Sequence, residues 1–387
     1  MFLLDLNGSM TYRAFATLLY ITTLFSTKSK DFSPARPDPP ELRGVVNLTI
    51  DAGNGRSEQY EFTAISGLAF DSLGQIFVSD ASTHDVRIFN ALGGYLYKIG
   101  QKGAGPSDFL MPRNIAFSPS GQLWIDDGGN HRFCIYELGA PAGKFVKSVP
   151  FLSNRFALEH LHWDPMGNVV GVDLAPSRNP ADPPRLVRSF LDKNGSVFGR
   201  DTAPPVAADS TESWVLRGKG SVATYSKPFG AMRLYAFGGY GLAAYATNTR
   251  YAVQVVDSKG KQLALIERKL TPVGLSAQDN DFVDMLLQRV AAQARQPPAS
   301  LGLARPKVKP VVAAIRFDLD GRLWVEHSVP GGQVHRADIY SATGTWTATM
   351  TWPANVSLNN GAVKGNSGLG VQTDAEGVQR PVRLTWR

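Results

Sequence analysis

The chain has 387 residues, of which 43% are hydrophobic and 19% charged, and its formal net charge is +7. These values are ordinary for a globular protein, and the 38 glycines and 25 prolines indicate many tight turns. The single cysteine, Cys134, excludes an internal disulfide framework and any metal site built from several cysteines. The positive charge is spread along the chain without a recognition motif, so nucleic acid is not an expected partner.

The N-terminal segment has the layout of an export signal. Arg13 precedes an apolar run over residues 14–26, and a polar, proline-rich stretch follows over residues 27–40. A positive residue before such a run is typical of a secretory signal, and the run is shorter than the ~20 residues of a membrane span. We therefore predict a signal peptide or uncleaved anchor over residues 1–26 and a linker over 27–40. The protein is expected to be periplasmic or secreted, with membrane contact only through an uncleaved segment.

One phrase occurs six times along the rest of the chain: an apolar strand, a turn with a glycine, a second apolar strand, and a further residue six positions after the glycine. The glycines are Gly74, Gly121, Gly167, Gly241, Gly321 and Gly368. The residues six positions later are Asp80, Asp127, Asp173, Thr247, His327 and Asp374. A phrase that repeats at roughly 45 residues is typical of a β-propeller, with one copy per blade. We predict an all-β fold over residues 41–387, a six-bladed β-propeller of four-stranded blades.

The last blade is one strand short at the C-terminus. We predict that the strand over residues 45–50 completes it by pairing with residues 382–386, because joining the two ends of the chain removes open sheet edges.

Two intervals between repeats are longer than the others, and neither carries another copy of the phrase. We predict insertions over residues 201–229 and 270–310, both in links from an outer strand to the next inner strand. The second insertion contains one predicted helix between blades four and five, which begins at a capping box formed by Ser276 and Asp279. Its apolar residues, with a period near 3.6, include Phe282, Met285 and Val290. This helix either covers the propeller as a lid or only packs against it.

Part of the chain resembles the NHL repeat. The resemblance is carried by GQKGAGPSDFLMPRNIAF over residues 100–117 and GQLWIDDGGNHR over residues 121–132, and blade one is similar at Asp80, His84 and residues 86–89. The other blades keep only the strand–glycine–strand skeleton. Over about residues 41–387 the chain resembles bacterial six-bladed propeller proteins of NHL type. The resemblance implies the fold and leaves function open, because such folds host binding modules and enzymes alike.

The ring of residues six positions after the glycines is the main candidate site. An aspartate at the end of a strand often caps the next turn, which accounts well for Asp80 and Asp127. Nothing in the NHL pattern needs Asp173, His327 or Asp374, so these three are the candidate ligands of a cation. Two residues near the starts of inner strands, Asn114 and His160, join the candidate ligand-binding set.

Two functions therefore remain open at the level of sequence. The preferred one is an extracytoplasmic module that binds a protein or small-molecule ligand through the face bearing the insertions. The alternative is a hydrolase or lyase that uses a Ca²⁺ or Mg²⁺ ion in the central channel, as the resemblance to six-bladed lactonases and streptogramin lyases implies. The metal-ligand patterns of those enzymes have no residue-by-residue match in this chain.

Overall fold

The structure is a computed structural model that describes residues 38–53, 57–139, 143–150, 157–175, 185–202, 212–218, 221–330 and 334–387. The chain divides into a first unit, Met1–Asp38, and a second unit, Pro39–Arg387, and only the second is described below. The predicted signal peptide or anchor and most of the linker thus lie outside the described residues. Within the described ranges, no helix is both long and apolar enough to cross a membrane.

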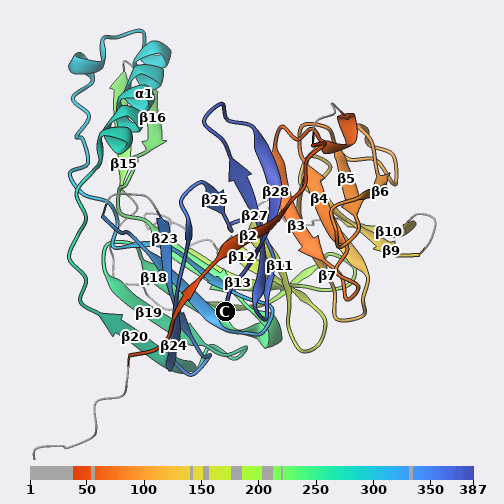
Figure 1. The fold of residues 1–387 in the computed structure, drawn as a ribbon. Coiled ribbons are helices and arrows are strands. Elements are labelled where there is room, and N and C mark those ends of the chain that lie inside the picture. The colour runs from red at the N-terminus through yellow and green to blue at the C-terminus, as the bar shows by residue number, and fades with distance from the viewer. Residues whose placement is uncertain are drawn as a thin grey trace, which may run out of the picture. The chain divides into compact units, whose positions relative to one another are not determined.

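Six antiparallel sheets form the blades of a β-propeller, as predicted (Figure 1). Blade one consists of β3 (Ile65–Phe70), β4 (Ile76–Asp80), β5 (Asp85–Phe89) and β6 (Tyr95–Ile99). Blade two consists of β7 (Pro112–Phe117), β8 (Leu123–Asp127), β9 (Arg132–Glu137) and β10 (Lys144–Pro150). Blade three consists of β11 (Ala157–Trp163), β12 (Val169–Ala175), β13 (Arg185–Leu191) and β14 (Val197–Thr202).

The second half of the ring follows the same order. Blade four consists of β17 (Arg233–Phe237), β18 (Ala243–Thr247), β19 (Tyr251–Val256) and β20 (Gln262–Arg268), with the short 3-10 helix η2 (Gly239–Gly241) in its first turn. Blade five consists of β21 (Val312–Phe317), β22 (Leu323–His327), β23 (Val334–Tyr340) and β24 (Trp346–Pro353). Blade six consists of β25 (Val356–Ser357), β26 (Val363–Lys364), β27 (Ser367–Thr373), β28 (Gln379–Thr385) and β2 (Val45–Thr49).

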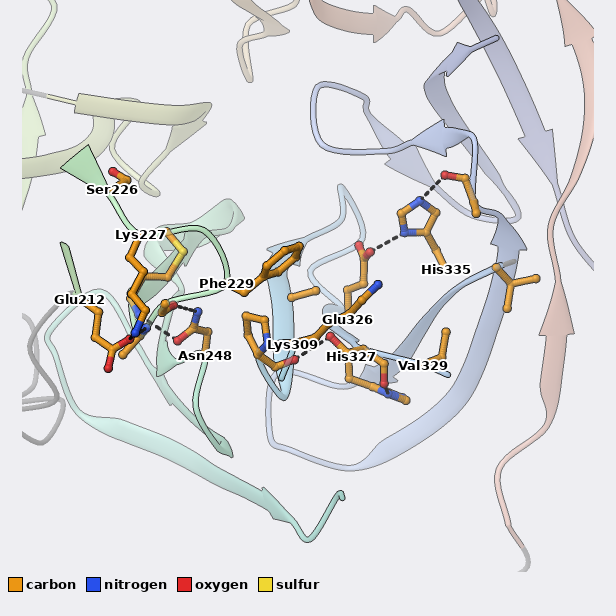
Figure 2. Close-up of a pocket in the computed structure, with 18 residues that line it drawn as sticks. Glu212, Ser226, Lys227, Phe229, Asn248, Lys309, Glu326, His327, Val329 and His335 are labelled. Atoms are coloured by element: carbon orange, nitrogen blue, oxygen red, sulfur yellow. Dashed lines mark hydrogen bonds and ion pairs between the residues drawn. The ribbon is translucent and has the colours of Figure 1, made fainter. Parts of the chain in front are cut away.

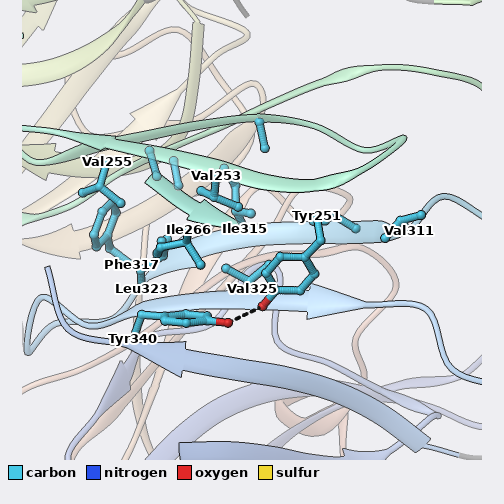
Figure 3. Close-up of a cluster of buried hydrophobic side chains, with 14 residues drawn as sticks. Tyr251, Val253, Val255, Ile266, Val311, Ile315, Phe317, Leu323, Val325 and Tyr340 are labelled. Carbon is cyan, nitrogen blue, oxygen red and sulfur yellow. Dashed lines mark hydrogen bonds between the residues drawn. The ribbon is translucent and has the colours of Figure 1, made fainter. Parts of the chain in front are cut away.

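A separate hydrophobic cluster lies between each pair of neighbouring blades. Side chains alternate between the two faces of a strand, so the second strand of each of blades one to five contributes to two clusters. In β4, Ile76 and Val78 pack against blade six, whereas Phe77 packs against blade two. Figure 3 shows the cluster between blades four and five, where Val253 and Val255 of β19 meet Ile315 of β21. Stability therefore depends on contacts all the way around the ring.

The two ends of the folded unit close blade six, which confirms the predicted pairing. β2 pairs antiparallel with β28, with Val45 opposite Thr385 and Thr49 opposite Val382. An additional strand, β1 (Glu41–Arg43), pairs parallel with β24 of blade five. The N-terminal segment of this unit therefore ties together blades five and six.

Blade six departs from the predicted repeat register. In blades one to five the turn glycines have φ between +75° and +82°, which a residue with a Cβ rarely adopts. The corresponding glycine of blade six is Gly365 (φ +58°), whereas Gly368 lies inside β27. The prediction that Gly368 is the turn glycine of blade six was therefore wrong. The hairpin between β26 and β27 is shorter than the hairpins of the other blades, so the repeat is shifted there.

The two insertions join into one packed substructure (Figure 1). The first forms the hairpin β15 (Ser213–Gly218) and β16 (Ser221–Ser226), and the second forms helix α1 (Ala277–Ala294). Trp214 of the hairpin packs against α1, and its indole N–H donates to the carbonyl of Ala304. The predicted capping box is confirmed, since Ser276 and Asp279 bond reciprocally. Of the apolar residues that show the helical period, Val290 is buried whereas Phe282 and Met285 are exposed, and Val283 and Leu287 are buried as well.

Candidate functional site

A pocket of about 450 Å³ lies where the insertions meet blades four and five (Figure 2). One wall comes from the segments that carry the insertions, including Glu212, Lys227 and Lys309. The facing wall comes from blade five, where Glu326 and His327 end β22 and His335 begins β23. The pocket thus combines chain segments from two insertions and a blade, and it carries both signs of charge.

Glu326 is a buried carboxylate with two partners. Its Oε1 lies 2.6 Å from Nδ1 of His335, and its Oε2 accepts a hydrogen bond of 3.1 Å from Nη2 of Arg316 on β21. Burial alone raises the pKa of Glu326, but the hydrogen bond from His335 and the charge of Arg316 outweigh it and hold the pKa below its ordinary value. Glu326 is therefore ionised and fixed in place at neutral pH.

His335 lies between two acceptors. Its Nδ1 contacts Glu326, and its Nε2 is 3.0 Å from the carbonyl oxygen of Ala354. The imidazole also stacks on Trp352, with the ring centroids 5.1 Å apart. A carbonyl oxygen and an ionised carboxylate both accept hydrogen bonds, so the two contacts fix the orientation of the imidazole at the edge of the pocket.

His327 differs from its neighbours because one of its polar atoms is left over. The residue is 9% exposed, and among the described residues its Nε2 has no hydrogen-bond partner. The Nδ1 atom lies 3.5 Å from the carbonyl oxygen of Ser328, and the buried Nε2 faces the carboxylate of Asp338 at 3.8 Å. Burial lowers the pKa of His327, and the charge of Asp338 offsets this only in part, so the ring is neutral near pH 7.

A buried network lies behind His327. The carboxylate of Asp338 accepts from the Tyr251 hydroxyl at 2.7 Å and from the guanidinium of Arg268, and it lies 3.8 Å from Nε2 of His327. Burial and this carboxylate raise the pKa of Tyr251 well above its usual range, so the phenol keeps its proton and donates. Since Asp338 already has these donors, the network positions the imidazole without requiring it to be charged.

The insertion wall is held by ion pairs and by a contact between two aromatic rings. Lys227 lies 2.8 Å from Glu212, and Lys309 lies 2.8 Å from Asp279, the capping residue of α1. The ring of Phe229 packs against the ring of Phe282 on the helix, with the ring centroids 6.2 Å apart. The position of α1 is therefore coupled directly to residues that line the pocket.

Two of the predicted site residues cap their own surroundings. The fully buried carboxylate of Asp80 accepts from the backbone N–H groups of Thr63, Ala64 and Ser82. In the same way Asp127 accepts from the N–H groups of Leu110 and Met111 and from the side chain of Asn130. Each aspartate ties the link before its blade to the turn after its second strand.

The remaining residues of the predicted set lie in different places or outside the described side chains. Asp374 follows β27 and accepts from the N–H of Val378 and from Arg380 in its own turn. Asp173 lies inside β12, opposite Val187, and the side chains of Asp173 and His160 lie outside the described part of the chain. Asn114 lines a narrow cavity inside the channel. Among the members of the predicted set whose side chains are described, His327 is the one that lines the insertion pocket.

The predicted metal site gains no support from the described side chains. Among them no group of three or more His, Cys, Asp or Glu residues is arranged to hold a metal ion. A Ca²⁺ or Mg²⁺ site at Asp173, His327 and Asp374 therefore stays a prediction from the sequence.

Several pocket residues were missed by the sequence reasoning. His335 lies eight positions after His327, beyond a loop, and no repeat position marks it. Lys227 and Lys309 belong to insertions that have no counterpart in the other blades. The one available signal was the pair Glu326–His327, since two such polar residues are unusual at the end of a buried strand.

Comparison with known proteins supports the propeller assignment. The family model described as 6-bladed beta-propeller, DUF5128, matches residues 57–163, which include blades one and two. The human NHL repeat-containing protein 3 is 27% identical over 88 residues, 19% of this chain and 25% of that protein. The chain thus spans about a quarter of the length of that curated relative.

Solved structures show the same architecture at low sequence identity. A member of the DUF4221 family from Bacteroides vulgatus has a TM-score of 0.55 and 12% identity, with 90% of this chain and 99% of that chain covered. Virginiamycin B lyase from Staphylococcus aureus, with quinupristin, has a TM-score of 0.41 and 10% identity, with 89% and 98% covered. At this level nothing about the ligands or activity of either protein transfers to this chain. Sequence and structure together support an NHL-type six-bladed β-propeller.

Proposed function

We propose that this protein is an extracytoplasmic binding module that holds a small-molecule ligand in the insertion pocket. The observation that carries the proposal is the construction of the pocket. Two insertions, far apart in the sequence, fold into one substructure around Trp214 and α1, and the segments at its base form one wall of the cavity. A volume of about 450 Å³ lies within the ~300–1,000 Å³ of small-molecule sites.

The polar groups in the pocket indicate the kind of ligand. The lining includes the carboxylate of Glu326 and the imidazoles of His327 and His335, polar groups that a hydroxyl, amide or ammonium group of the ligand would pair with. Lys227 and Lys309 on the opposite wall are already paired with carboxylates, so they contribute orientation and partial charge. A polar, hydroxyl- or amine-bearing molecule fits this arrangement better than a purely apolar one.

A pocket-filling variant tests this proposal. Ala313 is exposed and lines the pocket, so Ala313→Trp fills the cavity without disturbing the core. Ala375 is exposed in the turn after β27 and outside the pocket, so Ala375→Trp is the matched control. A thermal-shift screen with hydroxylated and amine-bearing fragments should yield compounds that raise the Tm of wild type and Ala375→Trp but not of Ala313→Trp. Stabilisation that persists in Ala313→Trp would contradict the proposal.

The extracytoplasmic location rests on Arg13 and the apolar run after it. N-terminal sequencing of protein from an exported fraction should find a mature chain that begins after about Ser26, or an intact chain anchored to the membrane. Recovery of the full-length chain in the cytosol alone would refute export.

A further inference from the structure

A second cavity lies at the other end of the propeller channel. Its volume is about 360 Å³, and all six blades contribute to its lining. Phe70, Phe117 and Trp163, which line it, are the last residues of the first strands of blades one to three. The insertion pocket instead includes Met232 and Ala313, at the start of the first strands of blades four and five. The two cavities therefore lie at opposite ends of the inner strands.

The lining of this second cavity, here called the turn-side cavity, is aromatic and apolar. Phe70, Phe117, Trp163 and Tyr240 all contribute rings. Tyr240 is 81% exposed and has a φ of +60°, which is uncommon for a residue other than glycine. Leu319, in the corresponding turn of blade five, is 54% exposed and also lines the cavity. Large exposed apolar side chains that gather at the rim of an apolar cavity are typical of a ligand-binding site.

The two carboxylates in the lining are already occupied by their own turns. Asp164 accepts from the N–H groups of Met166 and Asn168 and from the Asn168 side chain. Asp318 accepts from the N–H groups of Asp320 and Arg322 and from the side chains of Arg322 and Trp324. Since these turns already supply three donors to Asp164 and four to Asp318, the carboxylates are engaged within their own turns, and we expect the aromatic residues to dominate the contact with a ligand.

We propose that the turn-side cavity binds an uncharged small molecule with a flat ring system, as a site separate from the insertion pocket. Aromatic rings bind one another in offset or edge-to-face arrangements, and rings from three blades and η2 surround the space. The cavity volume falls in the range of small-molecule pockets, ~300–1,000 Å³. This inference does not rest on the function proposed for the other end.

The test uses 6-propionyl-2-(dimethylamino)naphthalene, an uncharged two-ring probe whose emission shifts to the blue in apolar sites. A Cβ added at Gly239, which lines the cavity, meets no heavy atom within 4 Å, so the backbone there tolerates a side chain and Gly239→Trp should narrow the cavity. Gly139→Trp is the matched control, because that glycine also has no atom within 4 Å and lies outside the cavity. Saturable binding of one probe per chain is expected in wild type and Gly139→Trp, and at least about tenfold weaker binding in Gly239→Trp.

A second pair of variants changes the rim alone. Leu319 and Leu265 are both 54% exposed, and Leu265 lies on the outer strand β20, away from the cavity. Leu319→Ser should weaken the probe several-fold, whereas Leu265→Ser should not. Ala313→Trp, which fills the insertion pocket, should leave probe binding unchanged. Failure of the probe to saturate, equal affinity in Gly239→Trp and wild type, or loss of binding in Ala313→Trp would each overturn the proposal.

Discussion

Blades two and five carry nearly the same second strand but use its end in opposite ways. β8 reads LWIDD and β22 reads LWVEH, so Asp126 corresponds to Glu326 and Asp127 to His327. In blade two, Asp127 joins the preceding link to the following turn through hydrogen bonds to Leu110, Met111 and Asn130. The most NHL-like blade of the chain therefore uses this position to hold itself together.

In blade five the capping task moves one residue along the chain. Ser328 donates through its backbone N–H to Val311 and through its hydroxyl to the carbonyl of Pro310. The ring of His327 is thereby released from the turn and lines the insertion pocket. A close motif match thus marks a structural role here, and the departure from the motif marks the candidate site.

The residues before these two positions differ in the same sense. Asp126 and Glu326 are both buried and both paired with an arginine, Arg113 or Arg316. Among the described residues Oδ2 of Asp126 has no hydrogen-bond partner, and burial raises the pKa of Asp126 to about 6. Glu326 gains His335 as a second partner, which keeps its pKa below the ordinary value against the effect of burial. The hydrogen bond from His335 therefore accounts for the difference: Glu326 is stabilised as an anion, whereas burial destabilises the anion of Asp126.

The largest expected effect is the loss of the cap in blade two. Asp127→Ala removes a buried carboxylate and leaves the N–H groups of Leu110 and Met111 without their acceptor. Removing one member of such a buried, charged arrangement costs about 3–5 kcal/mol of the free energy of unfolding. Urea denaturation of the whole chain measures this cost, with Asp127→Asn as the milder control. A loss below about 1 kcal/mol would show that Asp127 is not structural.

The next prediction removes the second partner of Glu326, so that this carboxylate keeps only an arginine, as Asp126 does in blade two. His335→Leu removes the partner of Glu326 and should lower the free energy of unfolding at pH 7 by about 2 kcal/mol, the range of a charged hydrogen bond. In wild type the pKa of Glu326 is lower in the folded than in the unfolded protein, so its ionisation stabilises the fold at pH values above 4.5, the ordinary pKa of glutamate. This stabilisation is lost as the pH falls through the folded-state pKa. Denaturation curves between pH 3 and 8 should show this contribution in wild type and not in His335→Leu; identical profiles would contradict it.

A smaller effect of opposite sign is expected at Asp126. Its folded-state pKa of about 6 exceeds the ordinary 3.8, so the folded protein binds the proton more tightly than the unfolded chain. The corresponding stability is present below pH 3.8 and is lost as the pH rises to about 6. Asp126→Asn, which resembles the protonated acid, should flatten this region and stabilise the protein at pH 8 by about 1–3 kcal/mol. A destabilised Asp126→Asn at pH 8 would mean that the charge itself is needed there.

The smallest effect is expected at Asp374. Its carboxylate is used by Val378 and Arg380 in its own turn, so Asp374→Ala should leave the affinity of pocket ligands unchanged. Isothermal titration with the best compound from the fragment screen measures this affinity. A tenfold loss in Asp374→Ala would restore the idea of one ligand site shared by the whole ring.

The fold was predictable because its signals are local. Glycine turns and apolar strands specify each blade, and the strand over residues 45–50 had a vacant outer position in blade six to fill. The site was less predictable because its walls come from distant segments. Glu326 and His327 were visible as an oddity within one strand, but Lys227, Lys309 and His335 gain meaning only once the insertions fold.

The helix shows the same limit. Its capping box is a contact over three residues and could be predicted, whereas its buried face depends on Trp214, which belongs to the other insertion. The 3.6-residue period includes Phe282 and Met285, which are exposed, whereas Val283 and Leu287 are buried in the cluster that contains Trp214. An amphipathic pattern defines a face only when its partner is known.

A crystal structure of the protein soaked with hydroxylated and amine-bearing fragments tests the central claim most directly. The account predicts bound fragments in the insertion pocket, in contact with Glu326 and His327 of its blade-five wall. It also predicts that Asp80 and Asp127 keep their backbone contacts in every complex. Fragments bound to the carboxylates of Asp80 and Asp127, with the insertion pocket empty, would contradict it.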